Sequence, residues 1–189
     1  MSTTNHTITI FLASSEELIY DRRCISSMIK DIDEILEPQG INICCKKWEN
    51  FFAFCTGNRT QDDYNHVLQH CDICLCMFHH KAGRYTIEEY EKAIEAYEQT
   101  NRPKTYVYMH DLVKGEVEED SLKEFKKKLL DQGLSWNNYA NINVLKYELL
   151  KIIEQFLIAN HLQPDSSNIT IESGYVLYYG HEITCMPNV

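Results

Sequence analysis

Apolar positions along the chain follow two patterns, short continuous runs and stripes at helical spacing. The continuous runs at residues 7–13, 41–45, 73–78 and 105–109 are typical of strands that are buried on both faces. Stripes of apolar side chains every three or four residues predict helices. These helices cover about residues 16–36, 61–70, 86–99, 120–130 and 144–161, and a short extended piece at 135–139 precedes the last of them.

Strands that alternate with helices in this way predict an α/β protein with a doubly wound parallel sheet of about five strands. The pattern changes after residue 163, where Glu172-Ser173-Gly174 separates two extended segments and predicts a β-hairpin. We therefore expect an α/β domain at residues 1–163 and a hairpin extension at 164–189. Because the chain stops soon after the hairpin, we interpret this extension as a junction to a further C-terminal module.

Composition narrows the classes of function. The chain has 189 residues, of which 44% are hydrophobic and 24% are charged, as in soluble globular proteins. A formal net charge of -10 argues against nucleic acid as the main partner. No apolar segment reaches the roughly 20 residues that a membrane span needs, and no secretory signal is recognisable. The sequence therefore predicts a cytoplasmic protein that binds neither nucleic acid nor a membrane.

The eight cysteines predict reduced, buried thiols and no disulfide framework. Cys71, Cys74 and Cys76, followed by His79 and His80, could be read as a metal site. Side chains alternate between the faces of a strand, so Cys74 and Cys76 share a face that Cys71 does not. No second Cys/His pair occurs at zinc-finger spacing. The sequence thus predicts no metal site, and the histidines are interpreted as loop residues.

Three segments with polar or small residues follow predicted strands and should meet at the carboxyl edge of the sheet. They are residues 11–15, Trp48-Glu49 and 83–89. The phosphate-loop, dinucleotide and serine-nucleophile motifs are all missing from the sequence. What remains is a carboxylate beside aromatic and small residues, which suits cleavage of a glycosidic bond through an oxocarbenium-like transition state.

Glu89 has two interpretations, and local sequence leaves both open. Thr86-Ile87-Glu88-Glu89 fits a capping box, in which Thr86 starts the helix and Glu89 reaches back to its amide. On the other interpretation the Glu89 carboxylate is catalytic. Glu88 is best explained as a charge that favours the helix N-terminus. Trp48 could be a ligand platform or a packing residue, and Arg84 could contact a phosphate or lie exposed in a loop.

Several short motifs, in order, resemble TIR-like domains found at the N-termini of bacterial STAND/NACHT-type defence proteins. The motifs are FLASS at 11–15, Asp21-Arg22, Trp48-Glu49 and GRYTIEEYEKA at 83–93. The resemblance covers about residues 6–160. It implies a flavodoxin-like fold and a role in bacterial antiviral defence, with a C-terminal STAND/NACHT-type module following this domain.

The resemblance also implies an activity, because catalytic TIR domains hydrolyse or cyclise NAD+ at the nicotinamide–ribose bond. Glu89 is followed by Tyr90 and, three residues later, Ala93, so it fits the family's catalytic glutamate better than Glu88. NAD+ would be the substrate, and no cofactor is expected. Arg84-Tyr85-Thr86-Ile87 replaces the Ser-x-x-Trp-Cys that typically precedes the glutamate. The residues expected to contact NAD+ are Phe11, Ala13, Ser14, Trp48, Arg84 and Tyr85.

Catalytic TIR sites are usually completed by a neighbouring subunit, so the resemblance implies activity on oligomerisation, with the phenylalanine-rich residues 50–60 as the expected contact. Two other functions stay open. One is a non-enzymatic homotypic interaction module of a larger STAND-type ATPase. The other is an enzyme similar to nucleoside deoxyribosyltransferases, which also break an N-glycosidic bond.

Overall fold

The computed structural model describes residues 5–47, 67–163 and 166–187. Its centre is a parallel sheet of five strands in the order β2-β1-β3-β4-β5. This is the flavodoxin-like strand order, so the α/β doubly wound fold expected from the sequence is confirmed. The strands are β1 (His6–Ser14), β2 (Ile41–Lys46), β3 (Ile73–Phe78), β4 (Lys104–His110) and β5 (Asn137–Tyr139).

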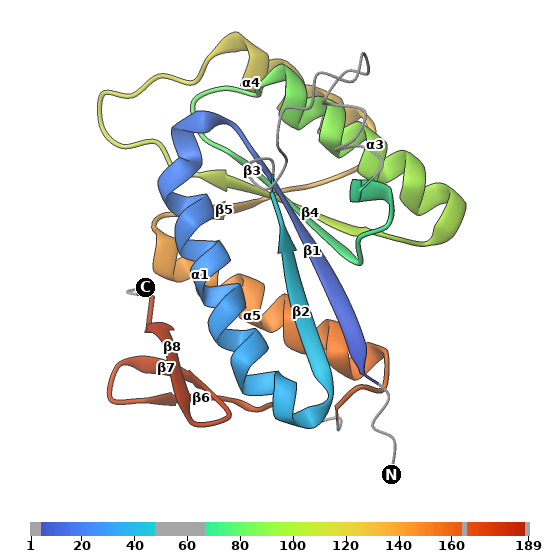
Figure 1. The fold of residues 1–189 in the computed structure, drawn as a ribbon. Helices are drawn as coiled ribbons and strands as arrows, with labels where there is room; N and C mark the ends of the chain where they lie inside the picture. The colour runs from blue at the N-terminus through green and yellow to red at the C-terminus, as the bar shows by residue number, and fades with distance from the viewer. Residues whose placement is uncertain (1–4, 48–66, 164–165, 188–189) are drawn as a thin grey trace, which may run out of the picture.

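Helices cover both faces of this sheet (Figure 1). α1 (Ile19–Leu36) and α5 (Ile142–Ala159) pack on one face, which we call the α1 face. α3 (Arg84–Thr100) and α4 (Asp120–Asp131) pack on the other, the α3 face. Each face has its own apolar core, and all six residues of β3 are buried between the two. The continuous apolar run at 73–78 therefore predicted both ends of the central strand correctly.

Side chains along β1 alternate between the two cores. Ile10 and Leu12 belong to the core of the α1 face, whereas Phe11 and Ala13 belong to that of the α3 face. Ser14, the last residue of β1, points toward α1, where it is bonded to Arg22. The expected NAD+ contacts on this strand thus divide between opposite sides of the sheet.

The C-terminal segment forms a second sheet of three antiparallel strands, β6 (Ile169–Glu172), β7 (Tyr175–Tyr178) and β8 (His181–Cys185). The expected hairpin is confirmed, with positive φ angles of 52° at Ser173 and 84° at Gly174 in its two-residue turn. The third strand was not predicted. Val176, Tyr178 and Ile183 join the core of the α1 face, so this sheet packs on α1 and α5 (Figure 1).

Several helix starts differ from the sequence expectation by two or three residues, with α1 beginning at Ile19, α3 at Arg84 and α5 at Ile142. A short 3-10 helix, η1 (Glu16–Leu18), precedes α1, and a second, η2 (Glu37–Gln39), follows it. α3 begins at Arg84 and not at Thr86. Of the helix expected at 61–70, only residues 67–70 are described: 67–69 are helical, and residue 70 is a turn. Trp48 and the 50–60 segment lie outside the described residues.

None of the helices in the described ranges is both long and apolar enough to cross a membrane.

Candidate functional site

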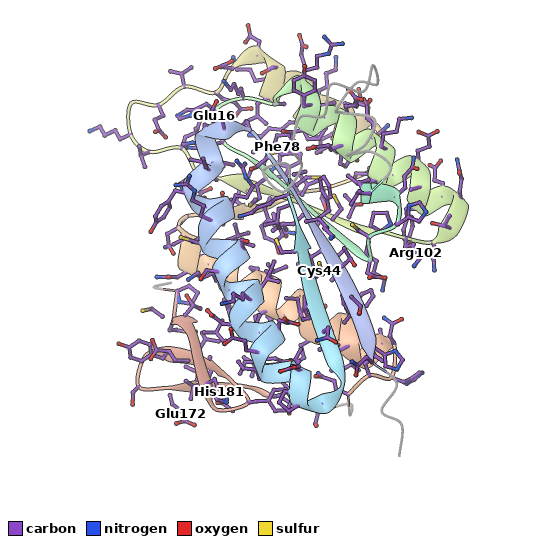
Figure 2. The ribbon with its side chains drawn as sticks, in the orientation of Figure 1. Glu16, Cys44, Phe78, Arg102, Glu172 and His181 are labelled. Carbon is purple, nitrogen blue, oxygen red and sulfur yellow. The ribbon has the colours of Figure 1, made fainter. Side chains whose placement is uncertain are left out.

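The carboxyl ends of the parallel strands meet at one edge of the sheet, where open α/β sheets bind their ligands. Figure 2 shows Glu16, just after β1, and Phe78, the last residue of β3, near this edge, whereas Glu172 and His181 lie on the small sheet at the other end of the view. The loop after β3 also reaches the end of β1. A Cβ atom built on Gly83 would lie 3.5 Å from the Ser15 Cβ.

Two adjacent charged residues of α1, Asp21 and Arg22, are buried and form hydrogen bonds to the ends of β5 and β1. Arg22 has no exposed surface, and its Nη1 donates to the Ser14 and Ser15 carbonyl oxygens at 3.2 Å each and to the Ser14 hydroxyl oxygen. Asp21 accepts a hydrogen bond of 2.7 Å from the Tyr139 hydroxyl at the end of β5. The Ser14 position is therefore fixed by a charged side chain of the helix that follows it.

Sequence patterns assigned no structural role to Asp21 and Arg22, which served only as one motif of the resemblance. The sequence does contain a local signal that these two residues are buried. Both residues lie between Leu18 and Ile25, on the apolar stripe that α1 turns toward the sheet. Charged residues within such a stripe are buried and need partners.

The capping interpretation of Glu89 is wrong in its geometry. α3 starts at Arg84, its N-cap is Gly83, and no side chain makes an N-cap hydrogen bond. Thr86 is the third residue of the helix, so the S/T-x-x-E motif lies inside α3 and not across its start. Glu88 and Glu89 consequently lie in the second turn. Glu89 is only 6% exposed, facing the sheet together with Tyr90 and Ala93.

The residues expected to contact NAD+ differ in how far they are exposed. Phe11 and Ala13 are almost completely enclosed in the core of the α3 face. Arg84 and Tyr85, in the first turn of α3, are exposed, Tyr85 by 59%. Ser14 lies between them at the strand end. The roles of these residues remain predictions, as does that of Trp48.

Two thiols and a phenol lie on the α3 face of the sheet, where Glu89 is also buried. Cys74 and Cys76 share this face, as the strand alternation predicted, with their sulfur atoms 3.7 Å apart. The expectation that Cys71 lies on the other face was wrong: Cys71 precedes β3 and packs in the same core. The hydrogen bond to Cys76 and burial raise the pKa of Cys74 well above its usual value, and the Glu89 carboxylate acts in the same direction. Burial raises the pKa of Tyr90 to about 12. Cys74 and Tyr90 are therefore uncharged near neutral pH.

Two histidines after β3 form a polar cluster with acidic residues at the same edge. The rings of His79 and His80 lie 3.8 Å apart, and both lie in the loop, as expected from the sequence. Glu17 of η1 approaches His80, and Glu116, from the loop between β4 and α4, approaches both histidines. Burial, and then the neighbouring histidines His80 and His110, lower the pKa of His79.

A cavity of about 210 Å³ opens beside this cluster. Its walls come from the ends of β3 and β4, the loop after β4, α4 and β5. Its lining residues are His79, Met109, His110, Asp111, Leu112, Glu118, Leu122, Lys126 and Asn138.

Comparison with known proteins gives little beyond the fold. The chain matches no protein-family model and no curated protein. Among solved structures it is similar to the crystal structure of a heterodimer of the RPS4 and RRS1 TIR domains. The match has 11% sequence identity and a TM-score of 0.45, and it covers 80% of this chain and 98% of that chain. This likeness is too weak to support an argument about function.

Proposed function

We propose that this chain is an NAD+-consuming TIR-like domain and that Glu89 is its catalytic carboxylate. The observation that carries the proposal is the position of Glu89, a 6% exposed carboxylate in the second turn of α3, away from any capping position. Removing a carboxylate from water is costly. A buried glutamate that does not start its helix therefore calls for another role, and the family resemblance supplies one.

The chemistry that we propose is cleavage of the bond between the ribose C1′ and the pyridinium nitrogen. Nicotinamide leaves as a neutral molecule with the bonding electrons, and positive charge develops on the ribose. The Glu89 carboxylate would stabilise that charge in a poorly solvated environment, where electrostatic effects are large. Water then adds at C1′ and loses a proton, which gives hydrolysis. Attack by a nucleophile within the same molecule gives the cyclic product instead.

We place the nucleotide where Ser14 and Ser15 at the end of β1 face Gly83 in the loop after β3. The small residues there let a ligand approach the backbone, and the Arg22 contacts hold the strand end in place. Phe11 and Ala13 would then form the floor beneath the ligand. Exposed Arg84 and Tyr85 lie at the helix start, where they can reach a phosphate and a base.

We further propose that the domain acts in bacterial immune signalling in the cytoplasm, as the effector part of a STAND/NACHT-type protein, and that it becomes active on self-association. The large exposed surfaces of two tyrosines, Tyr20 at 66% and Tyr85 at 59%, support such assembly. Both lie close to the edge of the sheet that carries the proposed site, one in α1 and one in α3.

The direct test measures nicotinamide release from NAD+ by the purified chain, free in solution and clustered on a fused oligomerisation scaffold. We expect turnover to rise with clustering. Glu89→Gln in the clustered form should lower the rate roughly 100- to 1,000-fold, the usual cost of removing one transition-state electrostatic contact. No NAD+ loss by the clustered wild type would refute the enzymatic proposal.

A second candidate is a non-enzymatic interaction module, and the burial of Phe11 and Ala13 favours it. These two residues have 0% and 1% exposed surface, so the described residues present them to no ligand. On this alternative, Glu89→Gln leaves self-association unchanged and NAD+ is never consumed. The nucleoside deoxyribosyltransferase alternative predicts release of a base from deoxynucleosides, which the same assay detects when they replace NAD+.

A further inference from the structure

Four polar side chains from three separate segments converge at the carboxyl edge of the sheet. Glu17 comes from η1, His79 and His80 follow β3, and Glu116 lies in the loop between β4 and α4. One donor atom each of Glu17, His79 and His80 can be chosen so that all three lie within 4.8 Å of one another. We propose that Glu17, His79 and His80 form a binding site for a divalent transition-metal ion, with Zn²⁺ as the best fit.

The distance between the Glu17 and His80 donor atoms agrees with tetrahedral coordination. Bonds of 2.0–2.2 Å from Zn²⁺ to nitrogen and oxygen place neighbouring ligand atoms about 3.3–3.6 Å apart. His80 Nδ1 lies 3.5 Å from Glu17 Oε2. A donor atom of His79 lies within 4.8 Å of the other two, and we propose that the His79 side chain moves closer when the ion binds.

Each acidic residue of the cluster is held by a second donor, which orients it. The Ser15 hydroxyl donates to Glu17 Oε1 at 3.0 Å and leaves Oε2 directed at His80. The Val113 amide donates to Glu116 Oε2 at 2.8 Å, and Glu116 Oε1 lies 3.2 Å from His80 Nε2. A histidine that binds a metal through one ring nitrogen is usually oriented by a carboxylate that accepts a hydrogen bond from its other ring nitrogen.

The donor types select the class of ion. Mg²⁺ and Ca²⁺ prefer sites made only of oxygen atoms, whereas imidazole nitrogen suits Zn²⁺ and its first-row neighbours. Three protein ligands leave a fourth position for water or a ligand, as in catalytic zinc sites. His79 also lines the 210 Å³ cavity with Asp111 and Lys126, so a small polar molecule bound there would lie next to the metal.

This site differs from the Cys/His metal site that the sequence argued against. That candidate combined the histidines with Cys71, Cys74 and Cys76, whose side chains are fully buried among the apolar residues of the α3 face. The carboxylate ligand of the new site, Glu17, comes from another part of the chain. The new site does not include Glu89, so its test does not depend on the proposed NAD+ chemistry.

Titration of the chain with Co²⁺, followed by visible absorption, tests the proposal. Tetrahedral Co²⁺ bound by nitrogen and oxygen absorbs in the visible region, and thiolate ligands add a charge-transfer band in the near ultraviolet. We expect one Co²⁺ per chain without the thiolate band, displaced by Zn²⁺. His80→Gln and Glu17→Gln should each weaken Co²⁺ binding by about tenfold or more.

The matched control is His181→Gln, an exposed histidine on the small sheet, and this change should leave Co²⁺ binding unaltered (Figure 2). Glu17→Gln keeps the proposal testable if a histidine variant folds poorly, because Glu17 lies at the surface. Three outcomes would overturn the proposal: no Co²⁺ binding by the wild type, binding that survives both His80→Gln and Glu17→Gln, and a thiolate spectrum. Survival of binding would identify the cluster as an ion-pair network only.

Discussion

The two faces of the central sheet bury polar groups in different ways. On the α1 face, Arg22 and Asp21 are buried against named partners, the Ser14 and Ser15 carbonyl oxygens and the Tyr139 hydroxyl. On the α3 face, Glu89 is buried near the Cys74 thiol, whose pKa is raised well above its usual value, and the neighbouring Tyr90 has its pKa raised to about 12. The first arrangement stabilises the fold. The second places one buried carboxylate near a thiol that stays protonated at neutral pH, which suits chemistry more than structure.

The largest expected contrast is in thiol reactivity. Burial raises the pKa of Cys71, on the α3 face, to about 12, whereas Cys185 is exposed on β8. Alkylation needs the thiolate, and its fraction below the pKa falls tenfold for each unit that the pKa rises. At pH 8 we expect Cys71 to react at least about 1,000-fold more slowly than Cys185, measured by iodoacetamide labelling and peptide mass spectrometry.

The pH dependence checks the sign of this shift. Because Cys71 stays protonated well above pH 9, its rate should rise about tenfold between pH 8 and pH 9 and continue to rise beyond it. Equal rates for the two cysteines in the folded chain would show that Cys71 is not enclosed, and labelling in urea provides the reference in which they should agree.

Removing the charge at Arg22 should cause the largest loss of stability. Arg22→Met leaves the Ser14 and Ser15 carbonyl oxygens without their shared donor. A buried polar group left unsatisfied costs about 1–3 kcal/mol of unfolding free energy, and this change leaves two of them. Urea denaturation measures it. The matched control is Arg23→Met, an exposed neighbour, which should change stability by less than about 0.5 kcal/mol. Similar losses for both variants would contradict our account of the α1 face.

A smaller loss is expected when the partner of Asp21 is removed. Tyr139→Phe deletes the hydroxyl that donates to Asp21 at 2.7 Å and leaves a buried acceptor unsatisfied. The expected cost is about 1–3 kcal/mol in the same urea experiment. Tyr20→Phe, at a tyrosine with 66% exposed surface, serves as the control and should have no measurable effect. A neutral result for Tyr139→Phe would mean that water replaces the phenol at Asp21.

The smallest effect should come from the surface ion pair between Lys128 of α4 and Glu91 of α3. Both side chains are more than 40% exposed, and pairs of this kind contribute about 0–1 kcal/mol. Lys128→Met should therefore lower the unfolding free energy by no more than this, and less still at high salt. A loss as large as that of Arg22→Met would remove the distinction between buried and exposed charges on which the comparison depends.

Sequence patterns predicted the fold well where one signal dominates. The six apolar residues of β3 have no polar neighbour within the run, so both of its ends were predicted correctly. The start of α3 was wrong because the S/T-x-x-E pattern at Thr86 also occurs inside helices, and Arg84 and Tyr85 carry no signal against a helix. β8 was missed because His181 and Glu182 are polar and exposed, which gives a strand of five residues little apolar alternation.

The candidate site was harder to predict because its contacts join distant segments. Tyr139 reaches Asp21 across 118 positions of the chain, and no local pattern encodes that distance. The histidine cluster likewise depends on η1 and the loop after β4 meeting at the carboxyl edge of the sheet. Glu89 was found because the family resemblance directed attention to it, whereas its local motif favoured a cap.

Nicotinamide release by the clustered chain, compared between Glu89→Gln and Glu88→Gln, tests the central claim most directly. The two changes remove the same charge from adjacent residues of one helix turn, but only Glu89 is buried among the residues of the α3 face. Our account predicts that Glu88→Gln keeps most of the wild-type rate, while Glu89→Gln loses roughly 100-fold or more without unfolding. Equal rates for the two variants would contradict a catalytic role for Glu89.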